Sequence, residues 1–311
     1  MMEVLHAGLC DLVMGASRPG FGALGVPAGG ASDPAALAAA NALVGNAAAA
    51  AGLEITLAGP TLRFPQGATV ALTGARFMAT RSYGAPVVWN ETLVLAPGET
   101  LTIGQVESGC RCWLAMQGGI MVPQVLGSYS TFLPAGFGGH MGRALQSGEA
   151  LAVGAQTGEV HVLRATPPAL DYPHAALRVV AGPQAGGFTD TGLAAFFGGR
   201  YQITAASDRR GLRLVGPAVP YAGGELPSQG LLPGAIQVPP DGQPIILGWD
   251  GPVTGGYPVI AVVVTADRPR LAQLKPGDTL QFMTIEVERA RALAAAQWVI
   301  LKTVVDRSFP S

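Results

Sequence analysis

Residues 237–257 read QVPPDGQPIILGWDGPVTGGY, in which two turn clusters enclose one short apolar run, Pro244–Leu247. A second apolar run, Val259–Val264, follows at once. Pro, Gly and Asp at this density are typical of tight turns, and short apolar runs between turns are typical of buried strands. The stretch therefore predicts two buried strands whose connecting loops are fixed by backbone geometry, and such loops are a candidate functional site.

Short apolar runs separated by turns also occupy most of the remaining chain. Strands of this length at close spacing favour barrels or sandwiches over a doubly wound parallel sheet. The other expected strands are Leu53–Leu57, Thr69–Leu72, Pro86–Val88, Leu101–Ile103, Arg111–Met116, Val160–Leu163, Leu177–Val180, Tyr201–Ile203, Leu212–Val215 and Thr279–Phe282.

Three segments carry helix signals. Ser32-Asp33-Pro34 offers an N-cap and a first-turn proline for an alanine-rich helix that runs to Val44. Glu286–Lys302 has apolar residues at helical spacing and predicts a helix that packs on the core. A shorter helix is expected over Arg268–Leu274, with Asp267 as its cap.

One stretch, residues 165–172, has no periodicity and contains adjacent prolines. It predicts a boundary between an N-terminal domain, residues 1–165, and a C-terminal domain, residues 173–311. A weak echo between GLEITLAGP (52–60) and GLRLVGP (211–217) suggests that the two halves are related modules.

The composition excludes several functional classes. The chain has 311 residues, of which 49% are apolar and 13% are charged, and a net charge of -1. This balance gives no electrostatic basis for binding nucleic acid or an anionic membrane. Three cysteines and four dispersed histidines do not suggest a disulfide framework, a zinc site or another metal site. Without a secretory signal pattern at the amino end, we expect a cytoplasmic protein.

The sequence settings of the lysines indicate which cofactors the chain does not carry itself. Lys275 and Lys302 are the only two in the sequence, and neither lies in a Gly-rich phosphate loop or in a biotinylation setting. The sequence therefore predicts that the chain neither cradles ATP in a P-loop nor carries its own biotin.

Polar residues in the turn-rich stretch are the first candidates for a site. Asp241, Gln243 and Asp250 lie on loops at strand ends, where a carboxylate and an amide can orient a ureido or lactam group. Gln237 opens the same stretch and is a further candidate for substrate binding. The alternative is that Asp241 serves only as a turn former, because Asp-Gly pairs favour turns.

Backbone donors and arginines supply further candidates. Thr254, Gly255, Gly256 and Tyr257 are expected to present backbone N–H groups to a developing oxyanion, although a simple hairpin turn explains the glycines equally. The cluster Ser207-Asp208-Arg209 and the earlier Arg18 offer guanidinium forks for a carboxylate or phosphate, with surface ion pairing as the alternative.

His140 lies in the loop PAGFGGHMGR, where four glycines can expose an imidazole and nearby N–H groups. A plain Gly-rich turn is the alternative interpretation, and the more common one.

Seven ordered blocks give the chain a family resemblance. It resembles the family that includes the second subunit of allophanate hydrolase, the C subunit of ATP-dependent 5-oxoprolinase, the antagonist of the sporulation kinase inhibitor, and the carboxyltransferase domain of urea carboxylase. The blocks are GVPAGGASD (25–33), ANALVGN (40–46), LEITLAGPTLRF (53–64), LTGA (72–75), VLGSYSTF (125–132), SDRRGLRL (207–214) and IQVPPDGQPIIL (236–247) through TGGYP (254–258).

The resemblance implies a mainly β fold of two cyclophilin-like β-barrel domains with a few short helices and a cleft between them. It implies a companion subunit of related fold, of the allophanate hydrolase first-subunit type. It also implies either ATP-dependent opening of a lactam or transfer of carbon dioxide from carboxybiotin, delivered in trans, to an amide nitrogen. We expect Asp241 and Arg18 to face a shared groove.

Three positions depart from the family pattern. Met14–Ser17 replaces the first part of a Q-D-x-G-R-P-G stretch, of which Arg18 remains. Tyr129 stands where arginine is common, and Gly251-Pro252 replaces a polar pair. These changes are consistent with an altered substrate, a regulatory subunit or a divergent paralogue.

From the sequence we expect a subunit of a 5-oxoprolinase-like complex that acts on the C–N bond of a small amide or lactam, with ATP bound with or by its partners. Asp241, Asp250, Gly255 and Gly256 are the expected catalytic residues. The alternatives are a carboxyltransferase component for urea or a similar amide, and a non-catalytic partner of an inhibitor subunit. The residues expected to bind substrate are Arg18, His140, Ser207, Asp208, Arg209, Gln237, Gln243, Thr254 and Tyr257.

Overall fold

The structure is a computed structural model that describes residues 1–156 and 176–307, with side chains to Gln297. The described chain divides into two compact units. Unit 1 comprises residues 1–18, 29–156 and 299–307, and unit 2 comprises residues 19–28 and 176–298. The predicted boundary at residues 165–172 and the predicted strand Val160–Leu163 lie outside the described residues.

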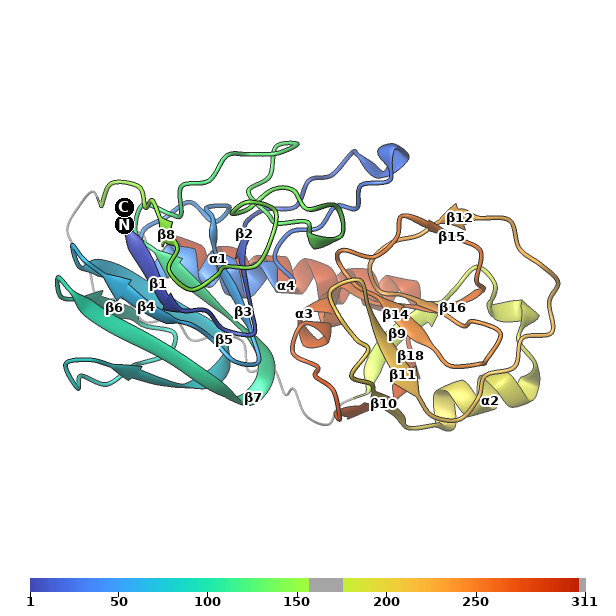
Figure 1. Ribbon diagram of the computed structural model, residues 1–311. Coiled ribbons are helices and arrows are strands. Elements are labelled where there is room, and N and C mark those ends of the chain that lie inside the picture. Colours follow the sequence, from blue (N-terminus) through green and yellow to red (C-terminus); the bar gives the residue numbers. More distant parts are fainter. Residues whose placement is uncertain (157–175, 308–311) are drawn as a thin grey trace. The chain divides into compact units, whose positions relative to one another are not determined.

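An eight-stranded antiparallel sheet forms unit 1 (Figure 1). Its long central strand β7 pairs with β5 along one edge, and with β4 and β3 in succession along the other. The strands are β1 (Met2–His6), β2 (Cys10–Met14), β3 (Gly52–Thr56), β4 (Thr61–Phe64), β5 (Ala68–Arg81), β6 (Thr92–Leu95), β7 (Glu99–Met116) and β8 (Ala150–Leu151).

Helix α1 (Pro34–Leu43) packs on this sheet, as the sequence predicts. The Asp33 carboxylate accepts hydrogen bonds from the N–H groups of Ala35 and Ala36, which fixes the start of the helix. Leu43 is buried against Ala71 and Ala115 of the sheet.

A second eight-stranded sheet, with the strand order β17-β10-β11-β14-β13-β16-β9-β18, forms unit 2. Its two outermost strands, β17 and β18, are separated in the chain by Gln281 alone, so the sheet must curl until its edges meet. The result is a nearly closed barrel, which leaves little open edge. The strands are β9 (Leu177–Ala181), β10 (Tyr201–Ile203), β11 (Gly211–Val215), β13 (Ala235–Gln237), β14 (Ile245–Leu247), β16 (Val259–Val263), β17 (Thr279–Leu280) and β18 (Phe282–Thr284).

A two-stranded ribbon of β12 (Gln229–Gly230) and β15 (Thr254–Gly255) lies apart from the barrel sheet (Figure 1). The remaining α-helices are α2 (Asp190–Gly198), α3 (Arg268–Leu271) and α4 (Val287–Arg307). Short 3₁₀ turns cover Gly22–Leu24, Leu133–Ala135, Ala185–Gly187 and Thr265–Asp267. None of the helices in the described part of the chain is long and apolar enough to cross a membrane.

The mainly β fold is confirmed, and several element predictions are wrong in detail. Pro86–Val88 forms no strand, and Leu101–Ile103 and Arg111–Met116 are parts of the single strand β7. The expected strand Thr279–Phe282 is divided between β17 and β18.

Asp267 does not cap helix α3, contrary to the sequence prediction. Its buried carboxylate accepts a hydrogen bond from the backbone N–H of Arg178 and pairs with the Arg178 and Arg270 guanidinium groups. The ion pair with Arg178 of β9 therefore replaces the local capping bond. Helix α3 itself is shorter than predicted and ends at Leu271.

Candidate functional site

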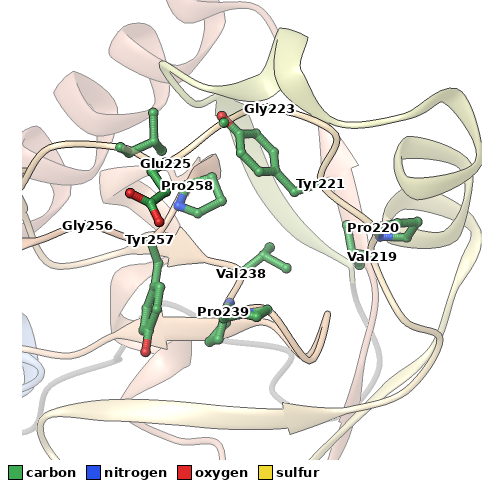
Figure 2. A pocket seen from close by; sticks show the side chains of 13 residues that line it. Val219, Pro220, Tyr221, Gly223, Glu225, Val238, Pro239, Gly256, Tyr257 and Pro258 are labelled. Carbon is green, nitrogen blue, oxygen red and sulfur yellow. The ribbon is translucent and has the colours of Figure 1, made fainter.

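A pocket of about 480 Å³ opens on unit 2 (Figure 2). Three loop segments form it: one between β11 and β12, one directly after β13, and one between β15 and β16. A volume of this size suits a small molecule. The lining residues are Val219, Pro220, Tyr221, Gly223, Gly224, Glu225, Leu226, Val238, Pro239, Pro240, Gly256, Tyr257 and Pro258.

The β12–β15 ribbon holds two of these segments together. Gln229 lies opposite Gly255 in the ribbon, so the chain on either side brings Leu226 next to Gly256. Gln184 fastens the ribbon to the barrel, because its side chain exchanges two hydrogen bonds with Gln229, of 2.9 and 3.0 Å, and accepts one from the Val259 N–H.

Tyr221 forms one wall of the pocket and is fixed by close packing. Its ring packs edge-on against Phe188 at a centroid distance of 4.9 Å. The neighbouring Gly223 has no room for a side chain, because a Cβ there would lie 2.2 Å from the Tyr221 hydroxyl oxygen. Glycine at this position therefore allows the ring to stay in place.

On the opposite segment, the buried residue Gln237 positions Tyr257. The Gln237 side-chain amide donates a 3.3 Å hydrogen bond to the Tyr257 carbonyl. A Cβ on Gly255 would lie 3.0 Å from that amide nitrogen and 2.8 Å from Leu231, so a larger residue would displace one of these side chains. Thr254, the other residue of β15, is exposed on the ribbon. Of the predicted site residues, Gly256 and Tyr257 therefore line the pocket, and Gln237 and Gly255 lie next to them outside the lining.

The other polar residues of the turn-rich stretch serve the fold. Asp241 is exposed, and its carboxylate accepts a 3.0 Å hydrogen bond from the Gln243 N–H. The Gln243 side chain bonds to both backbone polar groups of Gly216, at 2.9 and 3.3 Å. Neither side chain is among the residues that line the pocket.

Arg209 and Asp250 form a buried ion pair, with nitrogen–oxygen distances of 2.7 and 3.2 Å. Ser207 accepts a hydrogen bond from the Arg213 N–H, and Asp208 accepts one from the Arg210 N–H, which shapes the turn into β11. The geometry of this cluster matches the ion-pairing alternative, and its charges compensate each other away from solvent.

Arg18 is buried in unit 1, where it organises glycine-rich loops. Its guanidinium donates to the Ser130 carbonyl and lies over the Phe137 ring, 5.1 Å from the centroid. The Ser130 hydroxyl in turn accepts a 2.9 Å hydrogen bond from the Gly15 N–H. The motif block around Ser130 is therefore bound to the segment that contains Arg18.

His140 lies in the same group of loops and is half-buried. Its Nε2 atom is 3.5 Å from the Glu149 carboxylate, which also pairs with Arg143 at 2.5 Å. The hydrogen bond from Arg143 lowers the pKa of Glu149. No group of three His, Cys, Asp or Glu side chains within the described residues has a geometry that could hold a metal ion.

Comparison with known proteins identifies the family of this chain. A family model, the carboxyltransferase domain, subdomain A and B, matches residues 24–284. The chain belongs to this carboxyltransferase-domain family.

Relatives of two kinds share this domain. The chain is 38% identical to the C subunit of the 5-oxoprolinase of Escherichia coli over 93% of both chains. It is 33% identical to the urea amidolyase of Saccharomyces cerevisiae over 92% of its own length, which is 17% of that protein. Among solved structures, the urea amidolyase of K. lactis superposes with a TM-score of 0.89 at 30% identity, over 100% of this chain and 20% of that one.

Two of the departures from the family pattern are neighbours in this carboxyltransferase domain. Gly15 stands where the family pattern has Asp, and Tyr129 where arginine is common. A Cβ on Gly15 would lie 3.2 Å from the Tyr129 Cβ. A side chain at position 15 would therefore contact Tyr129.

Sequence reasoning missed Tyr221, Glu225 and the proline walls of the pocket. The only local signal was the pair Gly223-Gly224 between Tyr221 and Glu225, which mirrors the Gly255-Gly256-Tyr257 stretch on the other side. Nothing in either stretch alone shows that the β12–β15 ribbon brings them to one pocket.

Proposed function

We propose that this chain is a subunit of a 5-oxoprolinase-like complex that acts on the C–N bond of a small lactam or amide. The observation that carries the proposal is the match to the C subunit of Escherichia coli 5-oxoprolinase over 93% of both chains. The corresponding C subunit from Haemophilus influenzae is 32% identical over 98% of this chain and 97% of that one. A relationship over nearly the whole of both proteins supports a shared role in such a complex.

The pocket of unit 2 is the proposed place for the lactam or amide group. Proline, valine and tyrosine side chains would exclude water from the ring or carbon skeleton of the ligand. Backbone N–H groups of the glycine-rich segments would donate to its carbonyl oxygen, which is the role that the sequence predicts for Gly256.

We assign ATP to the companion subunit of the complex. The pocket is lined by the acidic Glu225 and, among the described residues, by no lysine, arginine or histidine, so it does not fit a polyphosphate. Lys275, the one lysine within the part of the chain whose side chains are described, is paired with Asp278.

The test uses the full chain purified with the products of its neighbouring genes. We expect ATP-dependent turnover in a panel of 5-oxoproline, 2-pyrrolidinone and urea, and its loss in Tyr257→Ala. Thr254→Ala, a change on the exposed ribbon outside the pocket lining, is the matched control. A complex that assembles but turns over no member of the panel would contradict the proposal and favour a non-catalytic partner role.

Carboxyl transfer to urea or a similar amide is the second candidate. The family model and the 33% identity to urea amidolyase favour it. In that case carboxybiotin, supplied in trans by a separate carrier, would provide the activated carboxyl group. The pocket fits a neutral amide because, among the described residues, Glu225 is the one charged side chain that lines it. Turnover that depends on bicarbonate, a biotin carrier and biotin carboxylase would select this alternative.

A further inference from the structure

Glu225 is the one charged side chain of the pocket lining among the described residues. Its side chain is exposed at the pocket, and Figure 2 shows its carboxylate among the lining residues, turned toward the segment of Gly256 and Tyr257. Among residues 1–156 and 176–297, no group bonds or pairs with this carboxylate. A carboxylate in this position is available to accept hydrogen bonds from a ligand.

Three backbone carbonyls of the lining already accept hydrogen bonds. The backbone carbonyls of Pro239 and Pro258 accept hydrogen bonds from the N–H groups of Gly242 and Val238, at 2.9 and 3.0 Å. The Tyr257 carbonyl accepts from Gln237 at 3.3 Å. Glu225 supplies the one carboxylate among the described residues of the lining, and its oxygens are open to a ligand N–H group.

The charge of Glu225 also sets what the pocket rejects. No cationic side chain of the described residues lines the pocket to offset it. An anionic ligand would bring a second negative charge next to this carboxylate, and the two charges would repel each other. A neutral lactam or ureido group instead presents an N–H donor and a C=O acceptor side by side.

We propose that Glu225 determines the specificity of this pocket: its carboxylate accepts a hydrogen bond from the N–H of a neutral lactam or ureido group and keeps anionic groups out. This inference rests on the proposed function and narrows its substrate to the neutral members of the class. In 5-oxoproline the carboxylate is attached next to the N–H, so Glu225 disfavours that ligand relative to 2-pyrrolidinone.

The test is a ligand-observed NMR titration of the full chain without partners. The probes are 2-pyrrolidinone, its N–H-free analogue γ-butyrolactone, its carboxylated analogue 5-oxoproline, and the cation pyrrolidinium. We expect 2-pyrrolidinone to bind about tenfold more tightly than the lactone, because the lactone cannot donate a hydrogen bond. We expect a similar gap of about tenfold over 5-oxoproline, because of charge repulsion.

Two variants separate the two roles of Glu225. Glu225→Gln keeps an acceptor without the charge, so it should retain the preference over the lactone and lose most of the discrimination against 5-oxoproline. Glu225→Ala should lose both. Equal binding of all probes, no binding of 2-pyrrolidinone, or unchanged ratios in the variants would overturn the proposal, and tighter binding of pyrrolidinium would assign the pocket to a cation instead.

The two proposals fail separately. Turnover by the complex together with probe binding that is indifferent to Glu225 would remove only the specificity role. Probe binding as expected, with no turnover in any assembled complex, would remove only the proposed activity.

Discussion

The loops around Arg18 in unit 1 and the loops around Tyr257 in unit 2 are both rich in glycine, but they use their polar groups differently. Around Arg18, the guanidinium and the serine hydroxyls are buried and bond to backbone atoms. Around Tyr257, the walls are proline and tyrosine, and the acidic side chain is exposed. A recognisable motif residue can therefore serve the architecture, while the chemistry that a ligand can reach lies in less distinctive residues.

Arg18→Ala should have the largest effect on stability. Loss of the guanidinium leaves the Ser130 carbonyl without that donor and opens space beside Phe137. We expect the free energy of unfolding to fall by about 3–4 kcal/mol. Urea denaturation measures it, with Glu225→Ala as the control that should change stability by about 0.5 kcal/mol or less. If Arg18→Ala keeps its stability and loses ligand binding, Arg18 is a ligand residue, as the sequence suggested.

The buried carboxyl group of Asp11 should make the stability of unit 1 depend on pH. Burial raises the pKa of this carboxyl to about 6. Because the folded state holds the proton more tightly than the unfolded chain, the stabilisation is fully present near pH 4 and is lost as the pH rises through about 6. The change corresponds to about 2–3 kcal/mol between pH 4 and pH 8.

Asp11→Asn cannot ionise, so its stability relative to the wild type should rise from pH 4 to pH 8. Thermal melts of both proteins across this range measure the difference. A difference that stays constant with pH would show that Asp11 does not titrate as a buried acid.

The sequence predicted those features that depend on local signals. Helix α1 follows from the Asp33 cap and the proline after it. The turn expected at Gly255 and Gly256 is wrong, because Gly255 pairs with Gln229 in the ribbon and neither glycine has a positive φ. The capping role of Asp267 was wrong because Arg178, distant in the sequence, supplies a stronger partner. Glu225 could not be predicted, because an exposed acid in a glycine-rich loop has no signature until the ribbon places it at the pocket.

The polar residues predicted for the site also depend on contacts between distant segments. The sequence predicts Asp250 and Arg209 as separate ligand-binding groups, whereas the structure pairs them with each other. Spacing along the chain does not reveal such a pairing between residues from two different loops.

Gly223→Ala tests whether the Tyr221 wall of the pocket is held in place by close packing. The added methyl group would displace the Tyr221 ring, since its position lies 2.2 Å from the hydroxyl oxygen. We expect a loss of about 1–3 kcal/mol in stability and weaker binding of 2-pyrrolidinone. Gly224→Ala is the matched control, because its Cβ would meet no atom within 4 Å. Equal behaviour of the two variants would show that Tyr221 is not held as described.

The smallest expected effect concerns Gly15 and Tyr129. A Cβ on Gly15 would lie 3.2 Å from the Tyr129 Cβ. Gly15→Asp alone and Tyr129→Arg alone should each destabilise unit 1, and the double variant, in which the two charges can pair, should recover part of the loss. We expect a coupling free energy of about 1 kcal/mol in a double-mutant cycle measured by urea denaturation. Strictly additive effects would show that the two positions changed independently.

The central claim is that ligands bind at the pocket of unit 2 and not at the buried motif residues. The most direct measurement is a map of backbone amide chemical shifts in the isotope-labelled full chain during titration with 2-pyrrolidinone. We predict saturable shifts at residues 221–226 and 256–257, with residues 128–131 and 207–210 unchanged. Shifts centred on Ser130 or Arg209, with the pocket segments silent, would contradict the account.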